Sequence, residues 1–383
     1  DNAWWLFILV VNIFLFFTIY IAFSKLGEIR LGGKEAAPEF SLSAWFSMLF
    51  SAGMGIGILF WSVAEPMFHY QSPPFGEAET LESAALAMKL TFLHWGLHPW
   101  GIYALVGLSL AFFAYNKKLP LSIRSVFYPL LGKRIHGYMG DIIDVLAVLA
   151  TLFGLATSLG FGVQQVNAGL THVFGLTNSI GMQVILITVI TLAATISVIT
   201  GIDKGVKFLS QMNIYIAGAF LIFLMIIGPS IFIFDSFTQN LGAYVQDLFA
   251  ISLWTETYQQ SDWQNSWTVF YWSWWISWSP FVGMFIARIS RGRTVRQFVL
   301  GVLIVPTIIT FLWLSAFGGS AIFLELKDAG AGIAAAVSED VAISIYALLE
   351  NFPFATFTSI AAIALVTSFF ITSSDSGSLV IDA

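Results

Sequence analysis

The chain of 383 residues contains no cysteine and few charged residues. Without cysteine it can form no disulfide bond, no thiolate metal site and no thiol nucleophile. Charged residues make up 10% of the chain, whereas soluble domains average about 25%. Hydrophobic residues account for 58% and aromatic residues for 16%. This balance excludes an ordinary soluble domain and predicts an all-α, polytopic membrane protein.

Apolar stretches long enough to cross a bilayer recur along the whole chain. We predict nine membrane-spanning segments, at 4–23, 43–63, 86–113, 142–170, 180–200, 211–234, 267–288, 297–318 and 354–381. The first segment is too long and too apolar for a secretory signal with a cleavage site. Because the chain starts at Asp1-Asn2-Ala3 and stops at Ala383 inside an apolar segment, we expect it to be a piece of a longer protein.

The basic residues are confined to alternate connections between these segments. Fourteen of the sixteen lie in 24–42, 114–141, 201–210 and 288–296. The intervening connections carry acids and almost no basic residues. By the positive-inside rule, the first and last segments both run from outside to inside. Two outer connections are predicted to contain helices, an amphipathic one at 235–253 and a partial one within 328–350. The inner stretch 117–141 either follows the membrane surface or forms a solvated loop.

Three closely spaced glycines, Gly53, Gly55 and Gly57, interrupt the second segment. Each weakens a helix by roughly 1 kcal/mol and lets backbone approach a ligand or another helix. Irregular backbone at membrane depth occurs only where it is buried in protein or lines a cavity. The stretch is therefore either a broken helix at a binding site or a tight contact between helices.

The seventh segment carries its own interruption at 277–280, which includes Pro280. Two segments beyond each interruption lies a Thr-Ser pair, at 157–158 and 372–373. The second and seventh segments are five apart and therefore cross the membrane in opposite directions. The correspondence between them predicts two inverted repeats with a site at their interface. We expect the following division: 1–42, a peripheral helix and loop; 43–234, the first repeat; 235–266, the outer helix and loop; 267–383, an incomplete second repeat.

Aromatic residues cluster in the third and seventh segments. On an unbroken helix, Trp95, Trp100 and Tyr103 would share one face. The seventh segment adds Trp274, Trp275 and Trp278. Such rings suit an interfacial belt or ordinary packing. They also suit a cage for a quaternary ammonium, which cannot donate hydrogen bonds and binds ring faces by cation–π attraction.

Several of these motifs together resemble the betaine/choline/carnitine transporter family. They are the glycine stretch 53–57 with Ala64-Glu65-Pro66, His94-Trp95 with Trp100, the tryptophan-rich run 270–278, and 287–293. The resemblance covers essentially the whole chain and implies an LeuT-like fold of five-plus-five inverted repeats, truncated here at both ends. It further implies a multi-pass protein of the cell membrane that is not an enzyme and works as a homotrimer in the lipid bilayer.

The same resemblance implies a substrate site near the bilayer midplane. Its aromatic box falls on Trp95, Trp100, Tyr103 and Trp275, with Trp274 and Trp278 beside the substrate path. Backbone amides of Gly53, Met54, Gly55 and Gly57 would bind the substrate carboxylate. Choline-transporting relatives have aspartate at the position of Gly57, so glycine here favours a zwitterion such as glycine betaine.

Sodium is the implied coupling ion, and no other cofactor or nucleic acid is expected. The first sodium site would involve Ser51, Met54, Phe369, Thr372 and Ser373. A second sodium site would involve Thr151 and Phe281. This site would be weaker, because Leu155 stands where the family has a threonine. The alternative within transport is sodium-independent or proton-coupled movement of choline, carnitine or ectoine.

Outside transport, the alternative is a membrane-embedded metal enzyme that uses His94 and His98. These histidines have i, i+4 spacing, but a third ligand with suitable spacing is not apparent. Glu65 is an intramembrane acid, which favours a functional role, yet its place before Pro66 favours a structural one.

Overall fold

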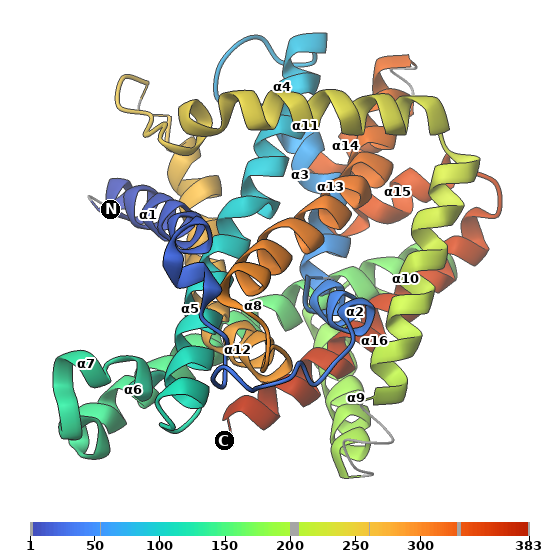
Figure 1. Cartoon of the computed structure of the whole chain (residues 1–383). Helices are drawn as coiled ribbons and strands as arrows, with labels where there is room; N and C mark the ends of the chain where they lie inside the picture. Colours follow the sequence, from blue (N-terminus) through green and yellow to red (C-terminus); the bar gives the residue numbers. More distant parts are fainter. Residues whose placement is uncertain (1–2, 54, 200–206, 260, 328–330, 382–383) are drawn as a thin grey trace.

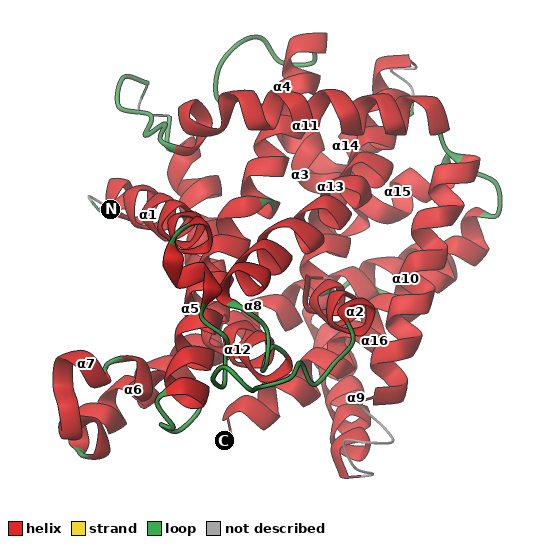
Figure 2. Cartoon of the chain, in the orientation of Figure 1, coloured by secondary structure: helices red, strands yellow, loops and turns green. Residues whose placement is uncertain are grey.

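A computed structural model describes residues 3–53, 55–199, 207–259, 261–327 and 331–381. These residues form helices and connecting loops without a β-strand, as Figure 2 shows. The longer helices are α1 (Trp4–Phe23), α2 (Leu42–Gly53), α3 (Ile56–Gln71), α4 (Leu81–Trp95), α5 (Leu97–Ala111), α8 (Tyr138–Phe174), α9 (Ile180–Ile199), α10 (Lys207–Ile227), α11 (Ser230–Ser252), α12 (Phe270–Ile289), α13 (Val295–Lys327) and α16 (Ala355–Ile381). The short ones are α6 (Ile123–Val126), α7 (Tyr128–Leu131), α14 (Ile333–Glu339) and α15 (Ser344–Glu350).

Within the described residues, five helical stretches are long and apolar enough to cross a membrane. They are Trp4–Phe23, Leu81–Asn116, Tyr138–Phe174, Val295–Lys327 and Ala355–Ser374. A sixth is reached if the bent pair of α10 and α11 counts as one span. Helices also lie in the other predicted ranges, so the all-α, polytopic class is confirmed.

The bend between α10 and α11 corrects one predicted boundary. The two helices meet at 108° beside Pro229, so the last residues of the predicted segment 211–234 belong to α11. In Figure 1, α11 runs across one end of the molecule, where it packs against α4 and α13. The helix predicted at 235–253 is confirmed, and the partial helix within 328–350 corresponds to α14 and α15.

Two basic connections meet at the opposite end of the molecule. The Leu31 N–H donates to the Arg293 carbonyl at 2.9 Å, and the Arg30 guanidinium donates to the Gly292 carbonyl at 2.7 Å. The segment of α6 and α7 also lies at this end in Figure 1. Its Arg124 contacts Asp144 and Asp141, and its hydrogen bond to Asp144 raises the pKa of Arg124 above its ordinary value.

A buried glutamate closes the outer loop between α11 and α12. Burial opposes ionisation of Glu256, but hydrogen bonds from the Ser261 hydroxyl and three backbone N–H groups outweigh it and lower the pKa of this carboxyl. The carboxylate thus orders the loop that enters the helix carrying the tryptophan-rich run.

The predicted interruption of the seventh segment is wrong, because α12 continues through Pro280. A proline removes one N–H, which would bond to the carbonyl four residues earlier. That carbonyl belongs to Ile276, and the Ser279 hydroxyl donates to it at 2.8 Å. A side chain thus supplies the donor that the proline lacks, and the helix stays unbroken.

The Ser279 hydroxyl should therefore stabilise the protein only while Pro280 is present. We expect Ser279→Ala to lower the free energy of unfolding by about 1 kcal/mol. In a Pro280→Ala background the restored N–H can bond to Ile276, so the same change should cost much less. A double-mutant cycle of thermal unfolding in detergent measures the difference. Equal costs in both backgrounds would contradict this account.

Candidate functional site: a buried aromatic cluster beside a helix break

The glycine-rich stretch breaks the helix as predicted. Helix α2 ends at Gly53 and α3 begins at Ile56, with Gly55 in extended conformation at φ −163° and ψ −170°. Met54 lies outside the described residues. A break here leaves the first N–H groups of α3 without partners in their own helix, which is the feature that can bind an anion.

Gly57 serves close packing, the other role considered for this stretch. A Cβ atom at this position would lie 2.7 Å from the Cη2 atom of Trp274 and 3.2 Å from that of Trp95. No real side chain tolerates the first distance without movement of the indole. The absence of a side chain at Gly57 therefore lets two tryptophans lie against the first turn of α3.

The third segment is not one straight helix. It breaks at Gly96, so Trp95 ends α4 while Trp100 and Tyr103 lie on α5. The prediction of an unbroken helix through these three residues is therefore wrong. Pro99 has no N–H to offer the carbonyl of Trp95, and the Tyr244 hydroxyl accepts the Leu97 N–H at 3.2 Å.

The four residues of the predicted box nevertheless form one chain of ring contacts. The Trp95 and Trp275 centroids lie 5.0 Å apart, those of Trp275 and Tyr103 6.5 Å, and those of Tyr103 and Trp100 5.5 Å, all edge to face. Each of the four is at most 7% exposed. An interfacial belt needs exposed rings, so this is an internal cluster.

Trp274 and Trp278 flank this cluster from the same helix. Trp274 stacks on Trp275 with centroids 4.6 Å apart, and its indole N–H donates to the Ser158 hydroxyl at 3.2 Å. Trp278 lies against Gly154 of α8. The first Thr-Ser pair, at 157–158, therefore supports the aromatic cluster through one of its hydroxyls.

A buried carboxylate is hydrogen-bonded to one ring of the box. The sequence did not indicate that several side chains converge on it. Glu65 of α3 is fully buried. Its Oε2 accepts the Trp95 indole N–H at 2.7 Å and the Tyr271 hydroxyl at 2.5 Å. Its Oε1 lies 2.6 Å from Nδ1 of His94 and 3.3 Å from Nε2 of His69. Glu65 thus connects α3, α4 and α12.

The histidines are grouped differently from the pairing considered for a metal enzyme. His98 lies 3.3 Å from the Asn12 amide oxygen and stacks on Trp272. It is His69 that joins His94 and Glu65, with ligand atoms all within 4.8 Å of one another. Hydrogen bonds between these groups account for that spacing.

Of the first predicted sodium site, the structure describes the part on α16. Thr372 is buried, and its hydroxyl lies 3.1 Å from the Asn213 amide nitrogen. Asn213 also contacts the Ser368 hydroxyl. Phe369 is 5% exposed and Ser373 half-buried. Met54 and the Ser51 side chain lie outside the described residues. Asn213 was missed because nothing in its own segment points towards α16.

Helix packing brings this part of α16 close to the break. A Cβ atom on Gly162 of α8 would lie 3.1 Å from Ile56 and 3.2 Å from Phe370. The start of α3 and the residue next to Phe369 therefore meet at the same glycine. The two residues of the second predicted sodium site contact other residues. The Thr151 hydroxyl donates to the Ala147 carbonyl at 2.9 Å, and the Phe281 ring packs on Trp278.

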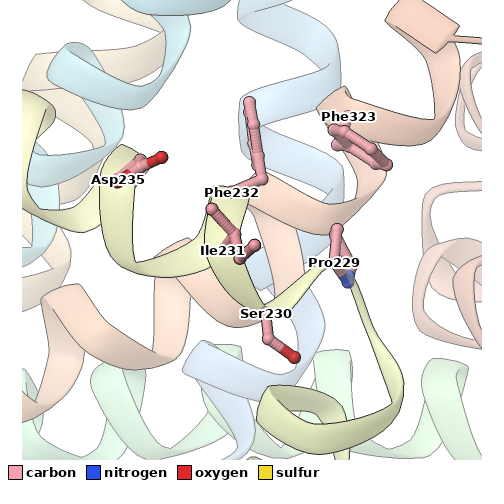
Figure 3. Close-up of a pocket in the computed structure, with 6 residues that line it drawn as sticks. All are labelled: Pro229, Ser230, Ile231, Phe232, Asp235 and Phe323. Carbon is pink, nitrogen blue, oxygen red and sulfur yellow. The ribbon is translucent and has the colours of Figure 1, made fainter.

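A hollow of about 590 Å³ lies elsewhere, at the bend between α10 and α11. It is lined by Pro229, Ser230, Ile231, Phe232, Asp235 and Phe323, as Figure 3 shows. None of these residues belongs to the aromatic box. The hollow is mainly apolar, and we assign it no part in substrate recognition.

An aromatic cluster buried beside a broken helix, among helices of membrane-spanning length, is a combination typical of secondary transporters. Residues 1–383 match the model of the betaine/carnitine/choline transporter family. The chain belongs to this family. It is therefore part of a multi-pass membrane transporter and not an enzyme, so the metal-enzyme alternative is wrong.

Relatives with assigned substrates are similar over nearly the whole chain. Glycine betaine transporter 1 of Vibrio parahaemolyticus is 53% identical over 99% of the chain and 73% of its own length. The glycine betaine transporter of Acinetobacter baylyi is 46% identical over 99% of the chain and 57% of its own length. Glycine betaine transporter OpuD of Bacillus subtilis is 45% identical over 100% of the chain and 74% of its own length.

Gly57 should be intolerant of even one methyl group. We expect Gly57→Ala to displace Trp274 and lower the free energy of unfolding by about 1–3 kcal/mol, the usual cost of overpacking. Thermal unfolding and the near-ultraviolet circular dichroism of the indoles measure both effects.

Gly160→Ala is the matched control, because a Cβ atom there meets nothing within 4 Å. Gly160 lies inside α8 and Gly57 in the first turn of α3, so the gain in helix propensity is at least as large in the control. A loss of stability seen only at Gly57 therefore reports the packing against the indoles. Equal behaviour of the two variants would contradict the close approach.

Proposed function

We propose that this chain carries out secondary active uptake of a quaternary-ammonium compatible solute, with glycine betaine as the first candidate. The observation that carries the proposal is the convergence of Trp95, Trp275, Tyr103 and Trp100 in the protein interior. Aromatic faces bind a trimethylammonium group with about 0.5–2 kcal/mol per contact. The substrate carboxylate would bind the backbone N–H groups at the helix break.

A zwitterionic substrate fits the charges around this site. At Gly57 the close approach of Trp274 leaves no room for an acidic side chain. The names of the relatives agree, since three of them are named for glycine betaine alone. Another relative in Vibrio parahaemolyticus, 50% identical, is named for glycine betaine, proline, choline and ectoine. Choline, carnitine or ectoine is accordingly the second candidate substrate.

For the mechanism, we propose alternating access in an LeuT-like fold of two inverted repeats, 43–234 and 267–383, and assembly as a homotrimer. The end of α2 at Gly53 and the start of α3 at Ile56 support this assignment. The contacts within the box support it too, because the rings touch one another and must separate to admit a substrate. Osmoprotection would follow from uptake of such a solute.

We further propose that Na⁺ drives the uptake. The ion would bind between the helix break and α16, at Ser51, Met54, Phe369, Thr372 and Ser373. Hard oxygen ligands and unwound carbonyls of this kind suit Na⁺. The approach of α3 to α16 at Gly162 supports this placement. A second ion would bind near Thr151 and Phe281, more weakly because Leu155 offers no hydroxyl. Sodium-independent or proton-coupled transport is the alternative.

Binding of glycine betaine to the full-length protein tests the substrate proposal. We expect a saturable change in tryptophan fluorescence that is lost in Trp275→Leu. Trp5→Leu is the control, because Trp5 lies on α1 and is 51% exposed. Saturable betaine binding that survives in Trp275→Leu would contradict the box. No response to betaine, choline, carnitine or ectoine would contradict the substrate class.

A separate experiment, with one double variant and one control, tests the sodium coupling. We expect the double variant Thr372→Ala, Ser373→Ala to raise the Na⁺ concentration needed for half-maximal uptake by about tenfold, or about 1.4 kcal/mol of ion binding. Thr188→Ala is the control, since this exposed hydroxyl only bonds to its own helix. Unchanged sodium dependence of the double variant would contradict the assigned site.

A further inference from the structure

The Glu65 carboxylate is surrounded by hydrogen-bond donors from α4 and α12, which carry two of the box rings, and from its own helix α3. The Trp95 indole and the Tyr271 hydroxyl bond to one oxygen, and His94 and His69 face the other. His94 also holds a second box residue, because its backbone carbonyl accepts the Trp275 indole N–H at 2.9 Å. Two of the three box tryptophans, Trp95 and Trp275, are thus positioned by the Glu65–His94 pair.

The pattern of partners fits an ionised Glu65 and neutral histidines. An indole N–H can only donate, so Oε2 accepts from Trp95, as a carboxylate oxygen does. Nδ1 of His94 can donate to Oε1 while its Nε2, 3.0 Å from the Thr268 hydroxyl, accepts. His69 donates from Nε2, and its Nδ1 has no partner within the described residues. One set of neutral tautomers therefore gives the carboxylate four donors, which is its full capacity.

The Glu65 carboxylate changes the electron distribution of the Trp95 indole in addition to fixing the orientation of that ring. A hydrogen bond from the indole N–H to an anion shifts electron density into the indole, so the ring face becomes a better partner for a cation. In a buried environment the negative charge also acts at longer range than in water. Both effects favour a cation at the face of Trp95.

We propose that Glu65 is a positioning residue for the aromatic box that also supplies the charge selecting a quaternary ammonium over an uncharged group of the same shape. This inference rests on the proposed function, since it assumes that a quaternary ammonium binds at Trp95 and Trp275. Glu65 itself does not touch the substrate. It acts through the Trp95 indole, and through His94 it fixes Trp275.

The test compares Glu65→Gln with the wild-type full-length protein, using two ligands of the same shape. Glycine betaine carries a trimethylammonium group, and 3,3-dimethylbutanoate has carbon in place of the nitrogen. We expect the variant to weaken betaine binding by about tenfold or more, which is about 1.4 kcal/mol. Binding of this analogue, whose tert-butyl group is uncharged while its carboxylate is kept, should stay unchanged or become tighter when measured directly or by competition.

Two further variants separate the charge from general damage. Glu350→Gln makes the same change at a glutamate of α15 that lies 3.3 Å from His172, which belongs neither to the box nor to the Glu65 cluster, and should leave the Kd of both ligands unchanged. Tyr271→Phe removes one donor from Glu65 but keeps its charge and the Trp95 bond. We expect Tyr271→Phe to weaken betaine binding less than Glu65→Gln does.

Three outcomes would overturn the inference. If Glu65→Gln weakens the binding of both ligands equally, Glu65 only supports the packing of the rings. If betaine binding is unchanged in Glu65→Gln, the carboxylate has no part in recognition. If the wild-type protein binds no betaine, the proposed function fails, and the inference fails with it. Betaine binding by wild type together with a null effect of Glu65→Gln would instead leave the proposed function standing.

Discussion

The hydrogen bonds to the buried Glu65 carboxylate constrain the arrangement of the surrounding helices. Moving a carboxylate out of water costs several kcal/mol unless hydrogen bonds replace its hydration. Here the replacement comes from Trp95 and His94 on α4 and from Tyr271 on α12, together with His69 on the glutamate's own helix. If one of these helices moved away, a donor would be lost and the anion left partly unsatisfied. These hydrogen bonds therefore fix the positions of α3, α4 and α12 relative to one another.

Glycines allow the box to form next to this carboxylate. Gly57 lets two indoles lie against the first turn of α3, and Gly96 interrupts the helix between Trp95 and the pair Trp100 and Tyr103. The rings then meet from three helical segments rather than from one helix face. Because the box residues already touch, ligand entry requires ring movement, and Trp274, stacked on Trp275, is the ring whose position Gly57 controls.

The sequence was sufficient for the class of protein and for the helix break that follows Gly53. These features depend on composition and local backbone preference, which a single segment reports. It was misleading at Pro280, because a hydroxyl one residue away restored the missing bond, and at 86–113, where Gly96 was not recognised as a break. The roles of Glu65 and Asn213 depend on partners far along the chain, such as Tyr271 and Thr372. Helical periodicity contains no information about such partners.

The central claim is that a quaternary ammonium is held by the aromatic box while Glu65 fixes its rings. A structure of the full-length protein with glycine betaine would test this most directly. The account predicts the trimethylammonium group among Trp95, Trp100, Tyr103 and Trp275, with the Trp95 indole N–H still on Glu65 and the ligand carboxylate at the start of α3. Betaine bound away from these rings, or a Trp95 indole turned away from Glu65 in the bound state, would contradict it.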